Sequence, residues 1–95
     1  MDKRKMRQTI EAFVTECSDG RLARIGCEWW VNIGREQGRI YYELVIDHPR
    51  PFGVNLRVSA ESLEDMPMGF ARLKDALEAL IRMIAAKLAT FAETS

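Results

Sequence analysis

The sequence predicts an α+β fold, a two-layer sandwich in which two helices cover one face of a three-stranded antiparallel sheet. Apolar residues recur at three- and four-residue spacing near both ends of the chain, a pattern typical of amphipathic helices. Between these segments, apolar and polar residues alternate through three stretches, which is typical of strands with one buried face. The apolar residues of each predicted helix need an apolar surface to pack against, and the apolar face of the sheet is the candidate.

The first helix is predicted over residues 3–17. Its apolar residues lie four, three, one and three positions apart, so they share one helix face: Met6, Ile10, Phe13, Val14 and Cys17. Ser18, Asp19 and Gly20 are expected to end it, because glycine suits the left-handed position beyond a helix C-terminus.

The strands are predicted over residues 21–34, 39–47 and 52–60, where apolar residues occupy alternate positions. Pro49 and Pro51 interrupt the pattern because they lack the backbone N–H that a ladder needs. Short connections favour an antiparallel meander, which places the first strand at an edge. Gly26 is interpreted as a possible bulge in that strand.

Two helical segments are predicted after the strands. A single turn is expected over residues 62–66, with Ser62 as its cap and acidic residues in its first turn. The main helix is expected over residues 67–93, with Pro67 in its first turn. The order of elements is then helix, three strands and helix, which forms one domain over residues 1–95.

The main helix carries more apolar surface than one buried face requires. A second stripe lies beside the first in its C-terminal half, and we interpret this region as a homodimer interface formed by Ile81, Ile84, Ala85, Leu88 and Ala92. The alternative is that the first helix and the chain end cover this stripe within one chain.

The outer face of the sheet has no predicted cover and carries charges of both signs. If the connection over residues 47–53 is symmetric, Glu43 and Arg57 oppose each other across two strands. Aromatic and aliphatic residues among these charges suggest a surface for another protein, formed by Trp30, Tyr41, Val45, Arg24, Arg39 and Arg57. The alternative is cross-strand packing that stabilises a small sheet.

The sequence contains no catalytic, cofactor-binding or metal-binding constellation, so we expect no enzyme, no cofactor and no metal. His48 is the only histidine, is expected to be solvated in a turn, and has no ligand partners at suitable spacing. Cys17 and Cys27 are expected to be buried reduced thiols, although a disulfide is open in principle. No signal peptide or membrane span is predicted, so we expect a cytoplasmic protein without a membrane partner.

Nucleic acid is the alternative partner. The 14 basic and 14 acidic residues of this 95-residue chain balance, which disfavours a general polyanion binder but permits a local basic contact. The one basic cluster consists of Lys3, Arg4, Lys5 and Arg7. Its position at a helix N-terminus disfavours cations, and a solvated chain end is the other interpretation.

The element order is similar to that of the double-stranded-RNA-binding domain. That family presents lysines at the N-terminus of its second helix, whereas residues 61–65 here include three acidic side chains, Glu61, Glu64 and Asp65. The order also resembles the first part of small dimeric secretion chaperones of bacteria. Both resemblances concern the order of elements alone, and neither carries functional residues across.

The sequence therefore predicts a small non-enzymatic protein-interaction module that forms a homodimer through its C-terminal helix and binds another protein. A weak nucleic-acid-binding protein is the alternative function.

Overall fold

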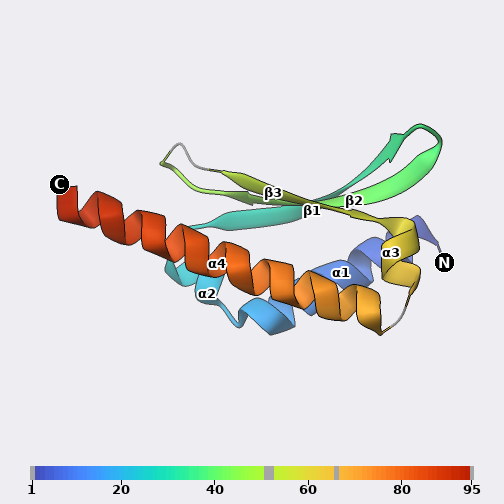
Figure 1. Cartoon of the computed structure of the whole chain (residues 1–95), viewed down its shortest axis with the longest axis horizontal. Helices are drawn as coiled ribbons and strands as arrows, with labels where there is room; N and C mark the ends of the chain where they lie inside the picture. Colours follow the sequence, from blue (N-terminus) through green and yellow to red (C-terminus); the bar gives the residue numbers. More distant parts are fainter. Residues whose placement is uncertain (1, 51–52, 66, 95) are drawn as a thin grey trace.

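The order of secondary-structure elements confirms the predicted α+β fold. The computed structural model describes residues 2–50, 53–65 and 67–94, with the backbone alone for residues 92–94. Two long helices flank three strands, and two single-turn helices join them (Figure 1). The elements are α1 (Lys3–Ser18), α2 (Arg21–Arg24), β1 (Glu28–Glu36), β2 (Arg39–Asp47), β3 (Val54–Ser59), α3 (Ala60–Glu64) and α4 (Met68–Thr94).

The strands form an antiparallel meander of order β1-β2-β3, as predicted. Gln37 and Gly38 connect β1 to β2, and both have positive φ angles, 53° and 75°. These angles are typical of a type I′ turn, whose twist matches that of the flanking strands. The register runs from Glu36 opposite Arg39 to Glu28 opposite Asp47. β2 begins and ends at the predicted residues and is the central strand.

Both long helices lie on the same side of the sheet, which confirms the two-layer arrangement (Figure 1). α1 packs under β1, α4 packs under β3, and the two helices contact each other. The buried side of β2 consists of Tyr42, Leu44 and Ile46, each no more than 4% exposed. The helix residues packed against the sheet include Met6, Ile10, Val14, Leu73, Leu77, Ile81 and Ile84.

The prediction that the first strand starts at residue 21 was wrong. Asp19 and Gly20 both have left-handed backbone angles, and they turn the chain directly into α2. Leu22 is buried there, and its carbonyl oxygen accepts the Cys27 N–H at 2.9 Å. Gly26, with φ 81°, lies in the turn before β1 and is not a bulge in the strand. The alternation over residues 23–27 therefore comes from a helical turn followed by a sharp change of direction.

The cap of the short helix after β3 also differs from the prediction. The Ser59 hydroxyl accepts the Ser62 N–H at 3.1 Å, so Ser59 and not Ser62 is the cap, and α3 covers Ala60–Glu64. Leu63 of this turn is fully buried. Gly69 near the start of α4 packs on the Ser62 carbonyl oxygen so closely that a Cβ atom would collide with it. Phe52, expected to start the third strand, lies outside the described residues.

An ion pair joins the start of α2 to the middle of α4. Both terminal nitrogens of Arg21 donate to the Glu78 carboxylate, one of them at 2.9 Å. The same guanidinium donates to the carbonyl oxygens of Cys17 and Ser18, at 2.8 and 3.0 Å, which satisfies the C-terminus of α1. The hydrogen bonds from Arg21 lower the pKa of Glu78 below its ordinary value, against a smaller opposing effect of burial.

Within the described parts of the chain, no helix is both long enough and apolar enough to cross a bilayer. Cys17 is half-buried and Cys27 is buried, and both are free thiols.

Leu77 lies at the centre of the helix layer and is 0% exposed. We expect Leu77→Ala to lower the free energy of unfolding by about 2–5 kcal/mol, because it removes buried methyl groups and leaves a cavity. Met83→Ala is the control, because Met83 lies on the same helix and is 36% exposed. This change should lower the free energy of unfolding by about 1 kcal/mol or less. Urea unfolding measures both, and equal losses would contradict the assigned core.

The Arg21–Glu78 pair predicts an acid-sensitive contribution to stability. The folded state lowers the pKa of Glu78, so the stabilisation is complete above the ordinary glutamate pKa of roughly 4.3 and is lost as the pH falls through the lowered value. The melting temperature of the natural chain should therefore decrease more steeply below that pH than that of Glu78→Gln. The melting temperatures of both proteins are measured from pH 6 to pH 2, with on the order of one reading per half unit. If the two curves of melting temperature against pH are parallel, this contribution is ruled out.

Candidate interaction surface

The outer face of the sheet lies opposite the helix layer, and no described helix covers it (Figure 1). The alternation predicted from the sequence is confirmed for all three strands from residue 28 onward. The side chains on this face are Glu28, Trp30, Asn32, Glu36, Arg39, Tyr41, Glu43, Val45, Asp47, Asn55, Arg57 and Ser59.

Arg57 is the centre of the charged part of this face. Its guanidinium contacts Glu36 at 2.7 Å and Glu43 at 3.6 Å, and it stacks over the Tyr41 ring at 4.1 Å from the centroid. Glu43 and Arg57 are directly opposite in the register, as predicted. Exposed ion pairs contribute little singly, so the importance of this cluster is that it holds Arg57 and Tyr41 in one orientation.

Tyr41 lies across Gly34, its partner in the β1–β2 register. A Cβ atom on Gly34 would collide with the far end of the Tyr41 ring, so the missing side chain is what allows the ring to lie flat here. The first strand was predicted to end at Gly34, whereas β1 continues to Glu36. The cross-strand register, which places Tyr41 on Gly34, was the missing information.

Trp30 and Val45 form the apolar part of the outer face. They are directly opposite each other in the register, and Trp30 is 43% exposed while Val45 is half-buried. Among the described residues, Trp30 is the only large apolar side chain of the sheet that is this exposed. An aromatic ring beside charged and amide groups is typical of protein-binding surfaces.

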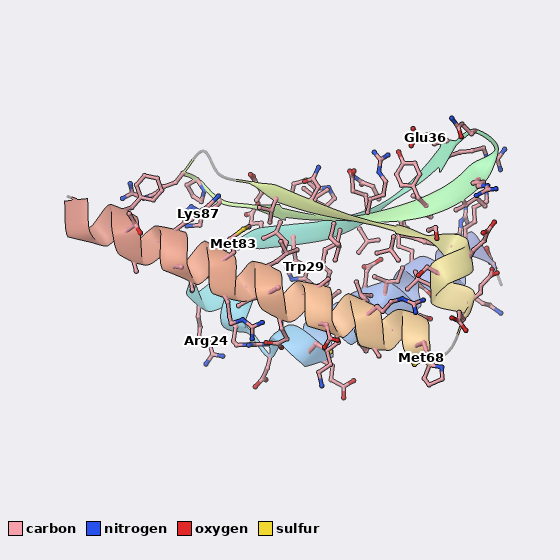
Figure 2. All side chains as sticks on the ribbon, viewed as in Figure 1. Arg24, Trp29, Glu36, Met68, Met83 and Lys87 are labelled. Carbon is pink, nitrogen blue, oxygen red and sulfur yellow. The ribbon has the colours of Figure 1, made fainter. Side chains whose placement is uncertain are left out.

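A shallow hollow of about 340 Å³ lies beside the Arg57 cluster, near the β1–β2 turn at which Glu36 is labelled in Figure 2. Residues of all three strands line it: Glu36, Gln37, Arg39, Ile40, Tyr41, Arg57 and Ser59. Arg39 thus joins the surface to which the sequence analysis assigned it. The hollow extends the outer face toward α3, so the candidate surface has a charged end and an apolar end.

Arg24 does not belong to this surface, and its assignment there was wrong. It lies on α2, where Nη2 donates to the Asp19 carbonyl oxygen at 3.0 Å. Figure 2 places it on the helix side of the molecule. The error follows directly from the misplaced start of the first strand.

His48 is not the solvated imidazole that the sequence suggested. It is half-buried, its Nε2 lies 3.1 Å from the Ile25 carbonyl oxygen, and its Nδ1 accepts the Arg50 N–H at 3.0 Å. Because Nδ1 is an acceptor, Nε2 is the donor, which defines the neutral tautomer. His48 therefore joins the end of β2 to the turn before β1 and has a structural role.

The predicted dimer stripe of α4 divides between core and surface. Ile81 and Ile84 are buried against the sheet of their own chain, and Leu88 is half-buried there. Ala85 is exposed, and the side chain of Ala92 lies outside the described residues. The exposed apolar residues of this half-helix are Ala79, Met83, Ala85, Ala86 and Ala89. Arg50 stacks on Phe91 at 4.8 Å, so the β2–β3 connection partly covers the end of α4.

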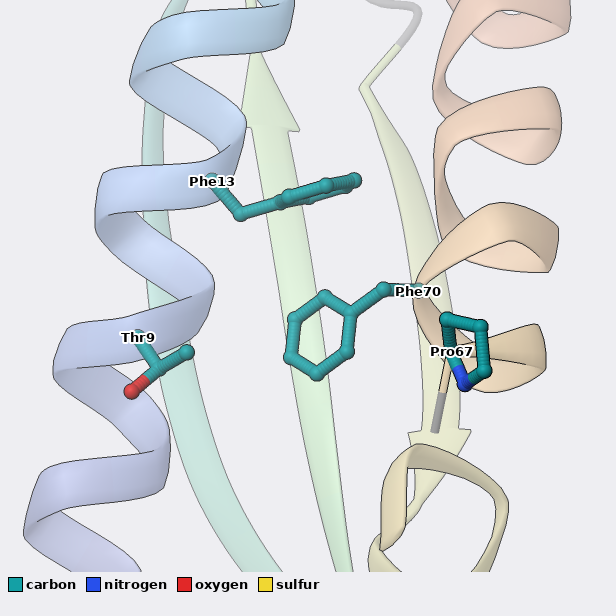
Figure 3. Close-up of a pocket in the computed structure, with 4 residues that line it drawn as sticks. All are labelled: Thr9, Phe13, Pro67 and Phe70. Carbon is teal, nitrogen blue, oxygen red and sulfur yellow. The ribbon is translucent and has the colours of Figure 1, made fainter. Parts of the chain in front are cut away.

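An apolar hollow of about 260 Å³ lies between α1 and the start of α4 (Figure 3). Phe13 and Phe70 meet there edge to face, with centroids 5.1 Å apart, and Thr9 and Pro67 complete the lining. Phe13 was predicted on the apolar face of the first helix, and the sequence did not place the hollow between the two helices.

The basic cluster lies on the exposed first turns of α1. Asp2 caps this helix by accepting the Arg4 N–H at 3.1 Å, and Arg7 pairs with Glu11 at 3.4 Å. Two carboxylates therefore lie beside the four cations, Lys3, Arg4, Lys5 and Arg7.

Comparisons with protein-family models, with curated proteins and with solved structures each returned no match. In the described part of the chain, no group of three or more histidine, cysteine, aspartate and glutamate side chains is arranged to hold a metal ion.

The contact of Tyr41 with Gly34 predicts that the effect of Gly34→Ala on the free energy of unfolding changes sign when Tyr41 is removed. In the natural chain, Gly34→Ala should destabilise the fold by about 1–3 kcal/mol, because the new Cβ atom displaces the ring from beneath Arg57. In a Tyr41→Ala background the same change should stabilise by about 0.4–1 kcal/mol, because alanine loses less entropy than glycine on folding. Chemical unfolding of the four proteins completes the cycle, and equal effects in both backgrounds would show that ring and glycine are not coupled.

Proposed function

We propose that this protein is a non-enzymatic interaction module that works as a homodimer and binds another protein through the outer face of its sheet. The observation that supports binding through this face is the exposed Trp30, which lies opposite Val45 and next to the Arg57 cluster. An exposed tryptophan supplies a large apolar contact area, and the ordered charges beside it supply specificity.

The order of the charged cluster also supports binding. Tyr41, Glu36 and Glu43 hold the Arg57 guanidinium in place before any partner arrives. A side chain that is already ordered loses less entropy when a complex forms. The partner that fits is a protein surface with an apolar pocket for Trp30 and acidic or carbonyl groups within reach of Arg39 and Arg57.

The basic start of α1 supports the nucleic-acid alternative less well. Arg7 is paired with Glu11, and Asp2 adds a further negative charge at the same end. Phosphate affinity depends on the number of cations that are free to neutralise phosphates, and these carboxylates compete for them.

The test is to purify the tagged protein from its native host, identify the co-purifying protein and measure its affinity with purified components. Trp30→Ser should weaken that affinity by at least tenfold, on the order of 1.4 kcal/mol or more, while the chain stays folded. Met83→Ser, an exposed apolar position on the helix layer, is the matched control and should bind unchanged. Unchanged binding by Trp30→Ser together with reduced stability would mean that Trp30 stabilises the sheet and does not contact the partner.

A further inference from the structure

We propose that the free edge of β1 is the interface between two copies of this chain, paired antiparallel about a two-fold axis at Val31. This inference rests on the proposed homodimer and assigns its interface. In the paired state, residues 28–34 of one copy lie opposite residues 34–28 of the other. The two three-stranded sheets then form one continuous sheet with all helices on one side.

The first argument is the chemistry of the edge itself. No strand of the described chain pairs with the outer side of β1. Its nine residues contain no proline, and its charged residues lie only near the two ends, at Glu28, Arg35 and Glu36. The six residues between Glu28 and Arg35, Trp29 to Gly34, are uncharged. Protected edge strands are short, charged or interrupted by proline, whereas the centre of this long strand carries neither charge nor proline.

The second argument is the direction of the backbone groups. Glu36 and Arg39 close a two-residue turn, so they form a hydrogen-bonded pair, and such pairs recur at every second residue of β1. The even-numbered residues therefore bond to β2. The N–H and C=O groups of Trp29, Val31 and Ile33 point to the free edge, where a second strand can pair with them.

The third argument is the complementarity of the edge to its own copy. Trp29 and Ile33 lie on the helix side of the sheet, pack against the core and are each only partly buried. Pairing about Val31 places Trp29 of each copy against Ile33 of the other, so each covers the surface that the other leaves exposed. Figure 2 shows Trp29 on the helix side of the sheet.

Charge distinguishes this register from the neighbouring one. Pairing about Val31 places Glu28 opposite Gly34, and Glu36 lies beyond the paired residues. Pairing about Asn32 would place Glu28 opposite Glu36 of the second copy at both ends, and like charges opposite each other destabilise a sheet. The two-fold axis at Val31 therefore avoids the contact between like charges and gives a better apolar match than the axis at Asn32.

The helix layer is compatible with this arrangement. Phe13 of α1 faces α4, and Met6, Ile10 and Val14 face the sheet. By helical spacing, Arg7 and Glu11 then lie on the opposite flank, beside the β1 edge. The two-fold axis makes the two α1 helices antiparallel on either side of this edge.

The assignment has a consequence for the outer face. Trp30 lies opposite Asn32 of the second copy, so the two Trp30 rings become diagonal neighbours across the axis. The dimer would thus present two adjacent copies of the proposed partner surface on one continuous sheet.

The test compares two charged substitutions by light scattering and sedimentation at concentrations from roughly 1 to 100 μM. Ile33→Lys and Leu56→Lys both place a lysine at a half-buried, helix-side position of an edge strand, but only Ile33 lies on the proposed interface. Ile33→Lys should weaken dimerisation at least tenfold and Leu56→Lys should leave it unchanged. Equal dimerisation of the two variants would overturn the assignment.

Hydrogen exchange of the natural chain tests the assignment without substitutions and decides it if Ile33→Lys fails to fold. The amides of Trp29, Val31 and Ile33 should exchange more slowly in the dimer than after dilution, whereas those of Asn55 and Arg57, on the other edge strand, should not change. A dimeric mass with concentration-independent exchange in β1 would overturn the β1 interface alone. A monomeric mass at all concentrations would remove the homodimer, while the Trp30 binding test would still stand.

Discussion

The burial of one side of β2 is the constraint on which the rest of the structure depends. β2 is the strand with neighbours on both sides, and its residues Tyr42, Leu44 and Ile46 are the most deeply buried part of the sheet. Their alternation makes one face apolar, and that face requires cover by two helical stripes. The chain supplies the stripes before and after the sheet, so α1 and α4 must lie on the same side. The Arg21–Glu78 pair then joins α2, which follows α1, to the middle of α4.

A sheet covered on one side has a second side that must remain stable in water. Here the solution is a set of ordered polar contacts around Arg57, with Tyr41 lying across Gly34 beneath it. In the proposed function, the side chains that make these contacts also form part of the partner surface. Trp30, on the same face, is 43% exposed.

A three-stranded sheet also has two open edges, and they differ physically. β3 has six residues and leads into α3, whose cap is the last residue of the strand. β1 has nine residues with an uncharged centre, and its helix-side residues Trp29 and Ile33 are only partly buried. One edge is thus limited by its length and its connection, and the other has both the backbone groups and the apolar surface to extend the sheet.

The amino-acid sequence by itself determined the class of fold, the extent of β2 and the face on which each side chain of the sheet lies, because periodicity and strand parity are local. It also placed Glu43 opposite Arg57. It did not determine where β1 begins, since Asp19, Gly20 and Gly26 redirect the chain through backbone angles that an alternating pattern does not reveal. It also did not separate Ile81 and Ile84, which are buried, from the exposed Ala85 of the same predicted stripe. Only the tertiary structure decided these points, together with the contact of Tyr41 with Gly34 and the joining of His48 to Ile25, because each depends on which distant segments meet.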